Sequence, residues 1–505
     1  MMNHWLIIPV AVPAMTAALL VLAMRHSLNG QRILSLVATT LQFAAAVGLY
    51  VFAGDGETRA YLLGNWPAPF GIVLVLDRLA ATMLLLTNLL AFGVVIAAIG
   101  DWDKRGRHFH ALFQFQLLGI NGAFLTGDLF NLFVFFEVLL IASYGLMLHG
   151  GGARRLKAGF HYIAINLIGS TVFLFAVGAI YAVTGTLNMA DLAMKVPQVT
   201  PANEALLSAG ALLLLTVFAI KSAMVPLHWW LPPTYGSTSP PAAALFAIMT
   251  KVGVYSIIRV YALIFGADAG PLAGIATPWI LPAGILTLVL GTIGVLAARS
   301  LLDLACYSLI ASMGTLLMAV GLTTAAGLAA AIYYAIQSTI VSAALFLLAG
   351  LLVQDGKGQT RLVRIPQPAT LFAGFYFLLA IAMVGMPPMA GFIGKLLILE
   401  AGRAASYTTA VWTAMLVTSL LLIVGFARAG IRTFWRSPRA ALSARRVPMR
   451  PILVIAAMIA AVAALSLLAG PVMDDLVATA EQILAPQRYI ATVLRPRLAS
   501  DLAGE

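Results

Sequence analysis

Apolar residues run along this 505-residue chain in long blocks, separated by short polar stretches. A membrane-spanning helix needs about 20 predominantly apolar residues, and the chain has room for about fourteen such blocks. They lie near residues 4–24, 32–52, 73–99, 109–126, 129–148, 159–184, 205–225, 241–265, 275–298, 301–321, 325–353, 367–401, 407–427 and 451–472. We therefore predict an all-α polytopic membrane protein with about 14 transmembrane helices.

Composition supports lipid as the main solvent of this chain. Hydrophobic residues make up 62% of it and charged residues only 10%, against about 25% charged residues in soluble domains. The mean hydropathy is +0.99, and we expect no soluble domain. No basic residue precedes the first apolar block, so we predict a first span there and not a cleaved signal peptide.

The distribution of positive charge predicts an orientation. The net charge is +12, which in a soluble protein would suggest nucleic-acid binding. Here 19 of the 30 lysines and arginines lie in loops after odd-numbered spans, and only three lie in loops after even-numbered ones. The positive-inside rule then places the odd loops in the cytoplasm and both termini outside.

A few ionisable residues fall inside predicted spans. A charge at the bilayer centre costs at least about 2.5–3.5 kcal/mol and usually marks an ion or proton path. Glu137 lies nine residues after Asp128, which puts it roughly 13–14 Å deep and near the midplane. Lys251 is equally deep, and Lys221 lies five residues before Pro226.

Glu and Lys suit proton transfer at such depth. Burial disfavours the charged form of both groups, whereas a neighbouring opposite charge favours it. A Glu–Lys pair can therefore load and release protons as contact is made and broken. The competing interpretation of these residues is a static ion pair that locks helices together.

Two predicted spans carry helix-breaking residues at comparable places. The seventh holds Pro226, Pro232 and Pro233, and the twelfth holds Pro387 and Pro388 with Lys395 close by. Interrupted helices at matching positions indicate inverted-repeat transporters. We predict N-terminal helices 1–3 over 1–100, two inverted five-helix repeats over 101–265 and 266–430, with helices 7 and 12 broken, and helix 14 with a tail over 431–505.

Other polar residues carry weaker signals. Near the membrane interface, snorkelling is the first interpretation of Asp77, Arg78, Arg259 and Glu400. His228 with Trp229 and Trp230 is typical of an interfacial aromatic belt, and His161 is either a relay or a packed histidine. His108 and His110 lack a third metal ligand nearby, Cys306 is a candidate small buried hydrophobe, and no motif for a nucleotide, haem, flavin or other cofactor is present.

Three stretches resemble a known family: GDLFNLFVFFEVLLIASYGLMLHG, FAIKSAMVPLHWWLPPTYGSTSPPAAALFAIMTKVGVYSIIRVY and GMPPMAGFIGKLLILEAG. They are similar to the antiporter-like membrane subunits shared by respiratory complex I and the Mrp-type (Pha/Mnh) cation/proton antiporters. The resemblance covers roughly residues 70–430. The opening residues, the HWWLPPTYGSTSP segment and the length are most similar to the D branch of the Mrp family.

The resemblance implies a fourteen-helix fold that works only with sister subunits. It places the family's essential fifth-helix glutamate at Glu137 and its seventh-, eighth- and twelfth-helix lysines at Lys221, Lys251 and Lys395. In the family these residues form a polar axis for protons along the membrane midplane.

The eleventh and tenth helices depart from the family pattern. Where many relatives carry His or Lys on the eleventh, this chain has Gln337, Ser338, Thr339 and Ser342, which do not titrate near neutral pH. A water-mediated link between Lys251 and Lys395 is therefore expected. Asp303 and Tyr307 stand where relatives often have a basic residue and a tyrosine, which puts the second-half proton route in question.

Three functions remain in competition at this point. The leading hypothesis is the proton-translocating subunit of a multisubunit Na⁺(K⁺)/H⁺ antiporter, a secondary transporter and not an enzyme. The second is a proton-pumping subunit of an NADH:quinone oxidoreductase or membrane-bound hydrogenase, and the third is a structural subunit with inert ion pairs. A long lateral helix after the last span would favour complex I, but only 33 residues follow residue 472.

Overall fold

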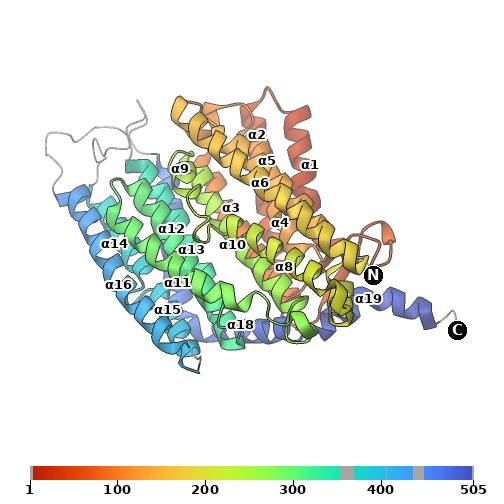
Figure 1. Ribbon diagram of the computed structural model, residues 1–505. Helices are drawn as coiled ribbons and strands as arrows, with labels where there is room; N and C mark the ends of the chain where they lie inside the picture. Colours follow the sequence, from red (N-terminus) through yellow and green to blue (C-terminus); the bar gives the residue numbers. More distant parts are fainter. Residues whose placement is uncertain (1–3, 353–368, 405–406, 436–447, 503–505) are drawn as a thin grey trace.

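The structure is a computed structural model that describes residues 4–352, 369–404, 407–435 and 448–502 (Figure 1). Two short strands, β1 (Arg59–Leu62) and β2 (Val73–Leu76), form an antiparallel hairpin. The helices are α1 (Ile8–Leu22), α2 (Leu28–Ala53), α3 (Arg78–Ala98), α4 (Phe109–Leu125), α5 (Leu129–Leu148), α6 (Ala153–Thr184), α7 (Met189–Lys195), α8 (Pro201–Lys221), α9 (Leu231–Tyr235), α10 (Pro240–Leu263), α11 (Thr277–Ala297), α12 (Leu301–Val320), α13 (Ala325–Leu352), α14 (Ala369–Val384), α15 (Ala390–Ala401), α16 (Thr408–Gly430), α17 (Met449–Leu467), α18 (Ala469–Leu484) and α19 (Gln487–Leu502).

The predicted helical membrane architecture is confirmed. Within the described residues, twelve helices are long and apolar enough to cross a membrane. The predicted span 109–126 corresponds to α4, which has only 17 residues, and the predicted span 367–401 is divided between α14 and α15. The count of about 14 therefore stays a prediction, because it depends on these two segments.

Residues 73–76 correct the predicted third span. They form β2 and pair with β1 from Arg59↔Leu76 to Leu62↔Val73. The helix begins only at Arg78, where the Asp77 side chain caps it by accepting a hydrogen bond from the backbone N–H of Ala80 at 2.9 Å. The fold is thus nearly all helical and not strictly all-α.

Two predicted boundaries also moved. Helix α6 begins six residues before the expected 159, so that Arg154, Arg155 and Lys157 lie in its first turns. Helix α17 ends at Leu467 and not near 472, since the chain turns there into α18. In both cases hydropathy marks the apolar stretch, whereas backbone hydrogen bonding sets the helix end.

Both expected helix breaks are present. Helix α8 ends at Lys221, and the nine residues 222–230 lead to the short α9. Helices α14 and α15 are separated by residues 385–389, where Gly385 takes a left-handed φ of +83°. Each break follows the fourth long helix of its predicted repeat, counting α4, α5, α6 and α8 in one and α11, α12, α13 and α14 in the other.

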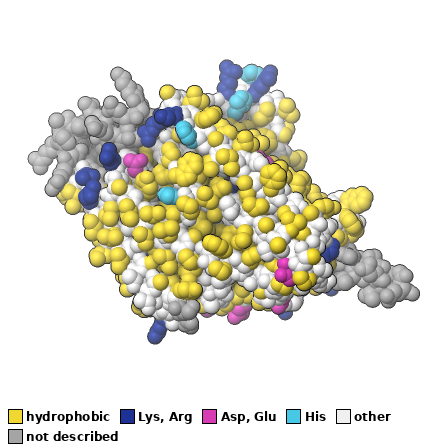
Figure 2. All heavy atoms as spheres, in the orientation of Figure 1, with side chains coloured by type: hydrophobic (Ala, Val, Ile, Leu, Met, Phe, Trp, Pro, Cys, Tyr) yellow, Lys and Arg dark blue, Asp and Glu magenta, His cyan; other side chains and the backbone are white. Residues whose placement is uncertain are grey.

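The C-terminal helices run along one end of the bundle. Helix α18 lies across the lower edge in Figure 1 and packs against α13, α10 and α3, while α19 packs on α7 and β1. We call this the α18 end of the molecule. In Figure 2, Lys and Arg gather mainly at the opposite edge, and a broad hydrophobic surface lies between the two edges.

Helices α11 and α12 approach so closely that only glycine fits between them. A Cβ on Gly314 would lie 2.1 Å from the backbone nitrogen of Leu288, and one on Gly291 would lie 2.5 Å from that of Ala311. Small residues allow this close backbone packing in membranes. The pair also supports the first break, because the hydroxyl of Thr287 on α11 accepts a hydrogen bond from the N–H of Val225 at 3.0 Å.

Candidate functional site: a buried polar line

Glu137 lies in the middle of α5 among apolar side chains, as its position in the sequence predicted. Its carboxylate accepts a hydrogen bond from the hydroxyl of Ser170 on α6. The residue is only partly buried, and Val134 and Ile141, one turn before and one turn after it, are exposed. Its partner therefore comes from another helix, and its outer side faces the lateral surface of the molecule.

Lys221 is the last residue of α8, directly at the first helix break. It is 6% exposed, and its ammonium donates a hydrogen bond to Asn166 Oδ1 on α6 at 2.9 Å. The nitrogen also lies 5.8 Å from the centre of the Phe136 ring. The C-terminal end of a helix carries partial negative charge, which favours an ammonium there.

Helix α6 contacts both α5 and α8 and carries the hydrogen-bond partners of Glu137 and of Lys221. Asn166 and Ser170 are four residues apart and so lie on one face of α6, where one binds the lysine and the other the glutamate. None of the described ion pairs joins Glu137 to Lys221. These two groups therefore have separate neutral hydrogen-bond partners.

Lys251 lies in the most deeply buried helix. All of the apolar window of α10 is buried, and Lys251 itself is 1% exposed. Its ammonium has no hydrogen-bond partner among the described residues, although buried polar groups nearly always have one. It borders a cavity of about 20 Å³ that is lined mainly by apolar side chains.

The eleventh predicted span, α13, packs against both α10 and α15. Gln337 on α13 is fully buried, and neither atom of its amide group has a partner among the described residues. Its nitrogen lies 3.4 Å from the place where a Cβ on Gly391 would stand, so it reaches the start of α15. The Ser342 hydroxyl, further along α13, is likewise buried and has no partner among the described residues.

Lys395 is bound at the second helix break. Its ammonium donates to the carbonyl of Val384, the last residue of α14, at 2.7 Å and to Ser419 Oγ on α16 at 2.9 Å. Both broken helices thus present a lysine to the C-terminal end of their first half. The two arrangements differ in chain order, because Lys221 precedes its break and Lys395 follows it.

Several weaker candidates are corrected. Arg259 does not snorkel: it forms a buried ion pair with Asp77 at 2.5 Å and 2.8 Å. Trp230 is buried with its indole N–H donated to the carbonyl of Ile220 at 3.1 Å, so it is no part of an aromatic belt. His161 is exposed and not packed in the interior.

The remaining minor expectations have mixed outcomes. Arg78 pairs with Asp475, and Glu400 is exposed at the end of α15. Cys306 is fully buried, as expected. Asp303 and Tyr307 are partly buried on α12.

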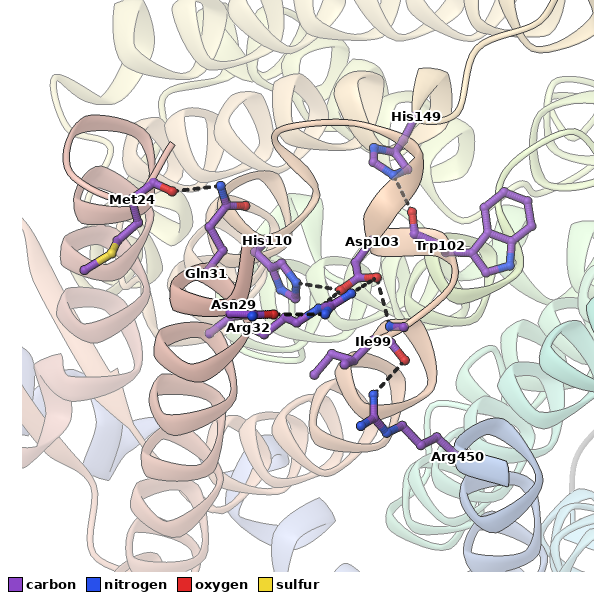
Figure 3. A network of polar contacts seen from close by, with 12 residues as sticks. Met24, Asn29, Gln31, Arg32, Ile99, Trp102, Asp103, His110, His149 and Arg450 are labelled. Atoms are coloured by element: carbon purple, nitrogen blue, oxygen red, sulfur yellow. Dashed lines mark hydrogen bonds and ion pairs between the residues drawn. The ribbon is translucent and has the colours of Figure 1, made fainter. Parts of the chain in front are cut away.

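A polar network that sequence reasoning missed lies around Asp103, in the connection between α3 and α4 (Figure 3). Arg32 donates to both carboxylate oxygens, at 2.6 Å and 3.1 Å, and the backbone N–H of Gly100 donates at 2.9 Å. Burial alone would raise the pKa of Asp103, but the interactions with His110 and Arg32 and the Gly100 N–H hold this pKa well below its usual range.

The missed residues of the polar line are Asn166, Ser170 and Ser419. Single polar residues on apolar helices carry no charge signal, so hydropathy does not distinguish them from ordinary helix contacts. The helical spacing of Asn166 and Ser170 was the one available signal. It becomes meaningful only once Glu137 and Lys221 are known to flank α6.

Comparison with known proteins places this site in context. Residues 126–422 match the family described as "NADH:quinone oxidoreductase/Mrp antiporter, TM". The chain is 40% identical to the D subunit of a probable K(+)/H(+) antiporter of Rhizobium meliloti (strain 1021), over 99% of each protein. It is 36% identical to the D subunit of the Na(+)/H(+) antiporter of Bacillus subtilis (strain 168), over 98% of this chain and 100% of that protein.

A solved structure extends the likeness to three dimensions. A chain of the Mrp complex from Dietzia sp. DQ12-45-1b superposes with a TM-score of 0.87 at 28% identity, covering 98% of this chain and 100% of that one. The matched family region contains Glu137, Lys221, Lys251 and Lys395.

Proposed function

Because this chain belongs to the NADH:quinone oxidoreductase/Mrp antiporter transmembrane family, we propose that it is the proton-translocating D subunit of a multisubunit monovalent cation/proton antiporter. It is part of a secondary transporter and not an enzyme. It acts with sister subunits in a hetero-oligomeric complex in the bacterial inner membrane, where proton movement drives export of Na⁺ or K⁺.

One observation carries the proposal: four ionisable residues lie in apolar helices, and none of them is in an ion pair among the described contacts. Each is held by neutral groups or by none. Such groups can change charge without breaking a salt bridge, which is what a proton relay requires. A static framework would pair them, as the fold does with Asp77 and Arg259.

We assign the proton path to Glu137, Lys221, Lys251 and Lys395. Glu137 stands at the lateral surface and exchanges protons with Lys221 across the Asn166–Ser170 face of α6. Lys251 continues the line in the centre. Gln337 and Ser342 then offer hydrogen-bonding atoms to water between Lys251 and Lys395. Lys395, whose ammonium is hydrogen-bonded at the second helix break, is the last residue of the path.

The two halves are proposed to be inverted repeats over 101–265 and 266–430, between the N-terminal helices 1–100 and the C-terminal segment 431–505. The matching positions of the two broken helices support this division. Matching breaks let each half present a lysine at a helix C-terminus inside the bundle.

The alternative is a proton-pumping subunit of a redox complex, since the matched family includes NADH:quinone oxidoreductase. The proteins compared at 40% and 36% identity over nearly their full length are instead named as D subunits of antiporters. The antiporter is therefore the better-supported function.

The test uses Glu137→Ala and Lys221→Ala in the assembled complex, reconstituted in liposomes. We expect cation-driven proton flux to be lost in both variants while assembly is kept. Glu400→Ala and Lys104→Ala are matched controls, because these two residues are exposed. Flux that persisted in both Glu137→Ala and Lys221→Ala would refute the proton path.

The sidedness of the chain has its own test. In a Cys306→Ala background, we expect Arg107→Cys to react with an impermeant thiol reagent only from the cytoplasm, and Asn203→Cys only from outside. Both positions are exposed. The reverse pattern would overturn the proposed location of both termini outside. The strongly basic stretches within 353–368 and 436–447 lie outside the described residues.

A further inference from the structure

The buried pair of Asp77 and Arg259 stands between two small cavities. On its inner side is the cavity of about 20 Å³ that Lys251 borders together with Met83 and Tyr255. On its other side is a cavity of about 10 Å³ beneath α18 and α19, lined in part by Arg259, Gln482 and Tyr489. Each is close to the size of one water molecule.

The groups that close the space between these cavities form one connected cluster. Arg259 donates two hydrogen bonds to Asp77 and, at 3.2 Å and 3.3 Å, two to the hydroxyl of Tyr255. The Tyr255 hydroxyl donates to the carbonyl of Phe124 at 2.5 Å. The ring of Tyr489 covers the guanidinium, with a centroid distance of 5.4 Å.

Lys251 is aligned with this cluster along α10. Arg259 follows Lys251 by eight residues, about 12 Å further toward the α18 end. Both residues lie in the helix whose apolar window is entirely buried, and Tyr255 stands midway between them. The unpartnered ammonium of Lys251 is thus separated from the α18 end by one small cavity, one ion-paired cluster and a second small cavity.

The side chain that covers the cluster, Tyr489, comes from a separate segment of the chain. Tyr489 is 6% exposed, yet its hydroxyl has no partner among the described residues. Its helix, α19, packs on α7 and β1. A side chain held mainly by its ring position can withdraw without breaking a hydrogen bond, and its withdrawal would expose the ion pair.

We propose that a second proton passage leads from Lys251 to the α18 end, and that Asp77, Tyr255, Arg259 and Tyr489 are its seal. The inference rests on the proposed function of Lys251 as a proton carrier. When the seal is closed, the ion pair and the Tyr489 ring keep water in the two cavities apart. When it opens, Lys251 releases its proton to water toward the α18 end, and the ammonium becomes a neutral amine.

The neighbouring pair of Arg78 and Asp475 provides a matched comparison. It also joins α3 to the C-terminal segment at the α18 end, but its side chains are 16% and 26% exposed and line neither cavity. Breaking it loosens the same region without opening the line from Lys251. A merely structural role for Asp77 would therefore give the same result as the control.

The experiment measures water access to the inner cavity in the assembled complex. Met83, which is 4% exposed, is changed to cysteine in a Cys306→Ala background and treated with a charged, impermeant thiol reagent from each side. We expect labelling from the α18 side to become about tenfold faster with Asp77→Ala or Tyr489→Ala, equivalent to about 1.4 kcal/mol in the opening equilibrium. Tyr489→Ala leaves the buried charges in place and so covers the case in which Asp77→Ala fails to fold.

A proton-leak assay tests whether the passage begins at Lys251. We expect liposomes with the Asp77→Ala or Tyr489→Ala complex to lose an imposed pH gradient faster, and the added change Lys251→Met to abolish that leak. No gain in labelling, or an equal gain with Asp475→Asn, would overturn the passage. Labelling does not depend on proton transport, so failure of the proposed function would leave that measurement intact and appear instead in the Glu137 and Lys221 variants.

Discussion

Gly314 offers a direct test of how the fold holds the first helix break. In Gly314→Ala, the new Cβ would lie 2.1 Å from the nitrogen and 2.5 Å from the Cα of Leu288. Ordinary contact needs at least 3.4 Å, so the α11 backbone must move by about 1 Å or more, because backbone atoms cannot rotate away as side chains do. The shift would act on Thr287, whose hydroxyl accepts the hydrogen bond from Val225 in the break.

The expected loss of stability follows from two opposing effects. Overpacking costs about 1–3 kcal/mol, and a backbone contact this short puts the cost at the upper end. Alanine recovers about 1 kcal/mol over glycine in a helix. The net loss is therefore about 2 kcal/mol.

The assay is the thermal midpoint of the purified complex, followed by fluorescence-detected size exclusion. Gly48→Ala is the control, because a Cβ there meets nothing within 4 Å, and this variant should be as stable as the wild type or slightly more so. A Gly314→Ala complex with an unchanged midpoint would refute the argument that α11 and α12 require glycine at their contact.

Two further variants test the bound groups. Asn166→Leu removes the acceptor of the Lys221 hydrogen bond, which is worth about 1.5–3 kcal/mol for a charged donor. Proton flux should therefore fall about tenfold or more. The control Thr171→Ala, on the exposed side of α6, should keep the wild-type flux. Proton flux at the wild-type level in Asn166→Leu would show that Asn166 is not part of the proton path. Asp103→Asn should lower stability at pH 7 by about 3 kcal/mol, since it breaks an ion pair whose carboxylate is fully buried. Asp101→Asn, in the more exposed pair with Arg105, should lower it by at most about 1 kcal/mol. Because the folded pKa of Asp103 is depressed, its contribution is complete above the unfolded carboxyl pKa, near 4, and is lost as pH falls below that value. The difference in free energy of unfolding between wild type and Asp103→Asn should therefore be constant from pH 7 to 5. A difference that disappeared in this range would contradict the depressed pKa of Asp103.

The sequence predicted the transmembrane architecture and the presence of ionisable residues inside it, because both leave strong local signals. Twenty apolar residues in a row and a charge among them are visible without any tertiary information. The two breaks were equally visible, since proline disrupts a helix wherever it is packed. Local signals thus identified Glu137, Lys221, Lys251 and Lys395 before their surroundings were known.

The partners of these residues were not predictable in the same way. Asn166 and Ser170 are recognised as partners of Lys221 and Glu137 only when α6 is seen to contact both α5 and α8. Asp77 and Arg259 are 182 positions apart, and each taken singly resembles an interfacial snorkelling residue. Strand β2 was mistaken for helix because VLVL is apolar in either structure, and only its pairing with β1 distinguishes the two.

The central claim is that protons cross this protein through Lys251, and its most direct test is cation-driven proton flux in liposomes that hold the assembled Lys251→Met complex. Methionine keeps much of the side-chain volume and removes an ammonium that has no partner among the described residues, so the variant should be as stable as the wild type or more so. We predict normal assembly and loss of flux. A Lys251→Met complex that exchanged protons for cations at the wild-type rate would contradict the account.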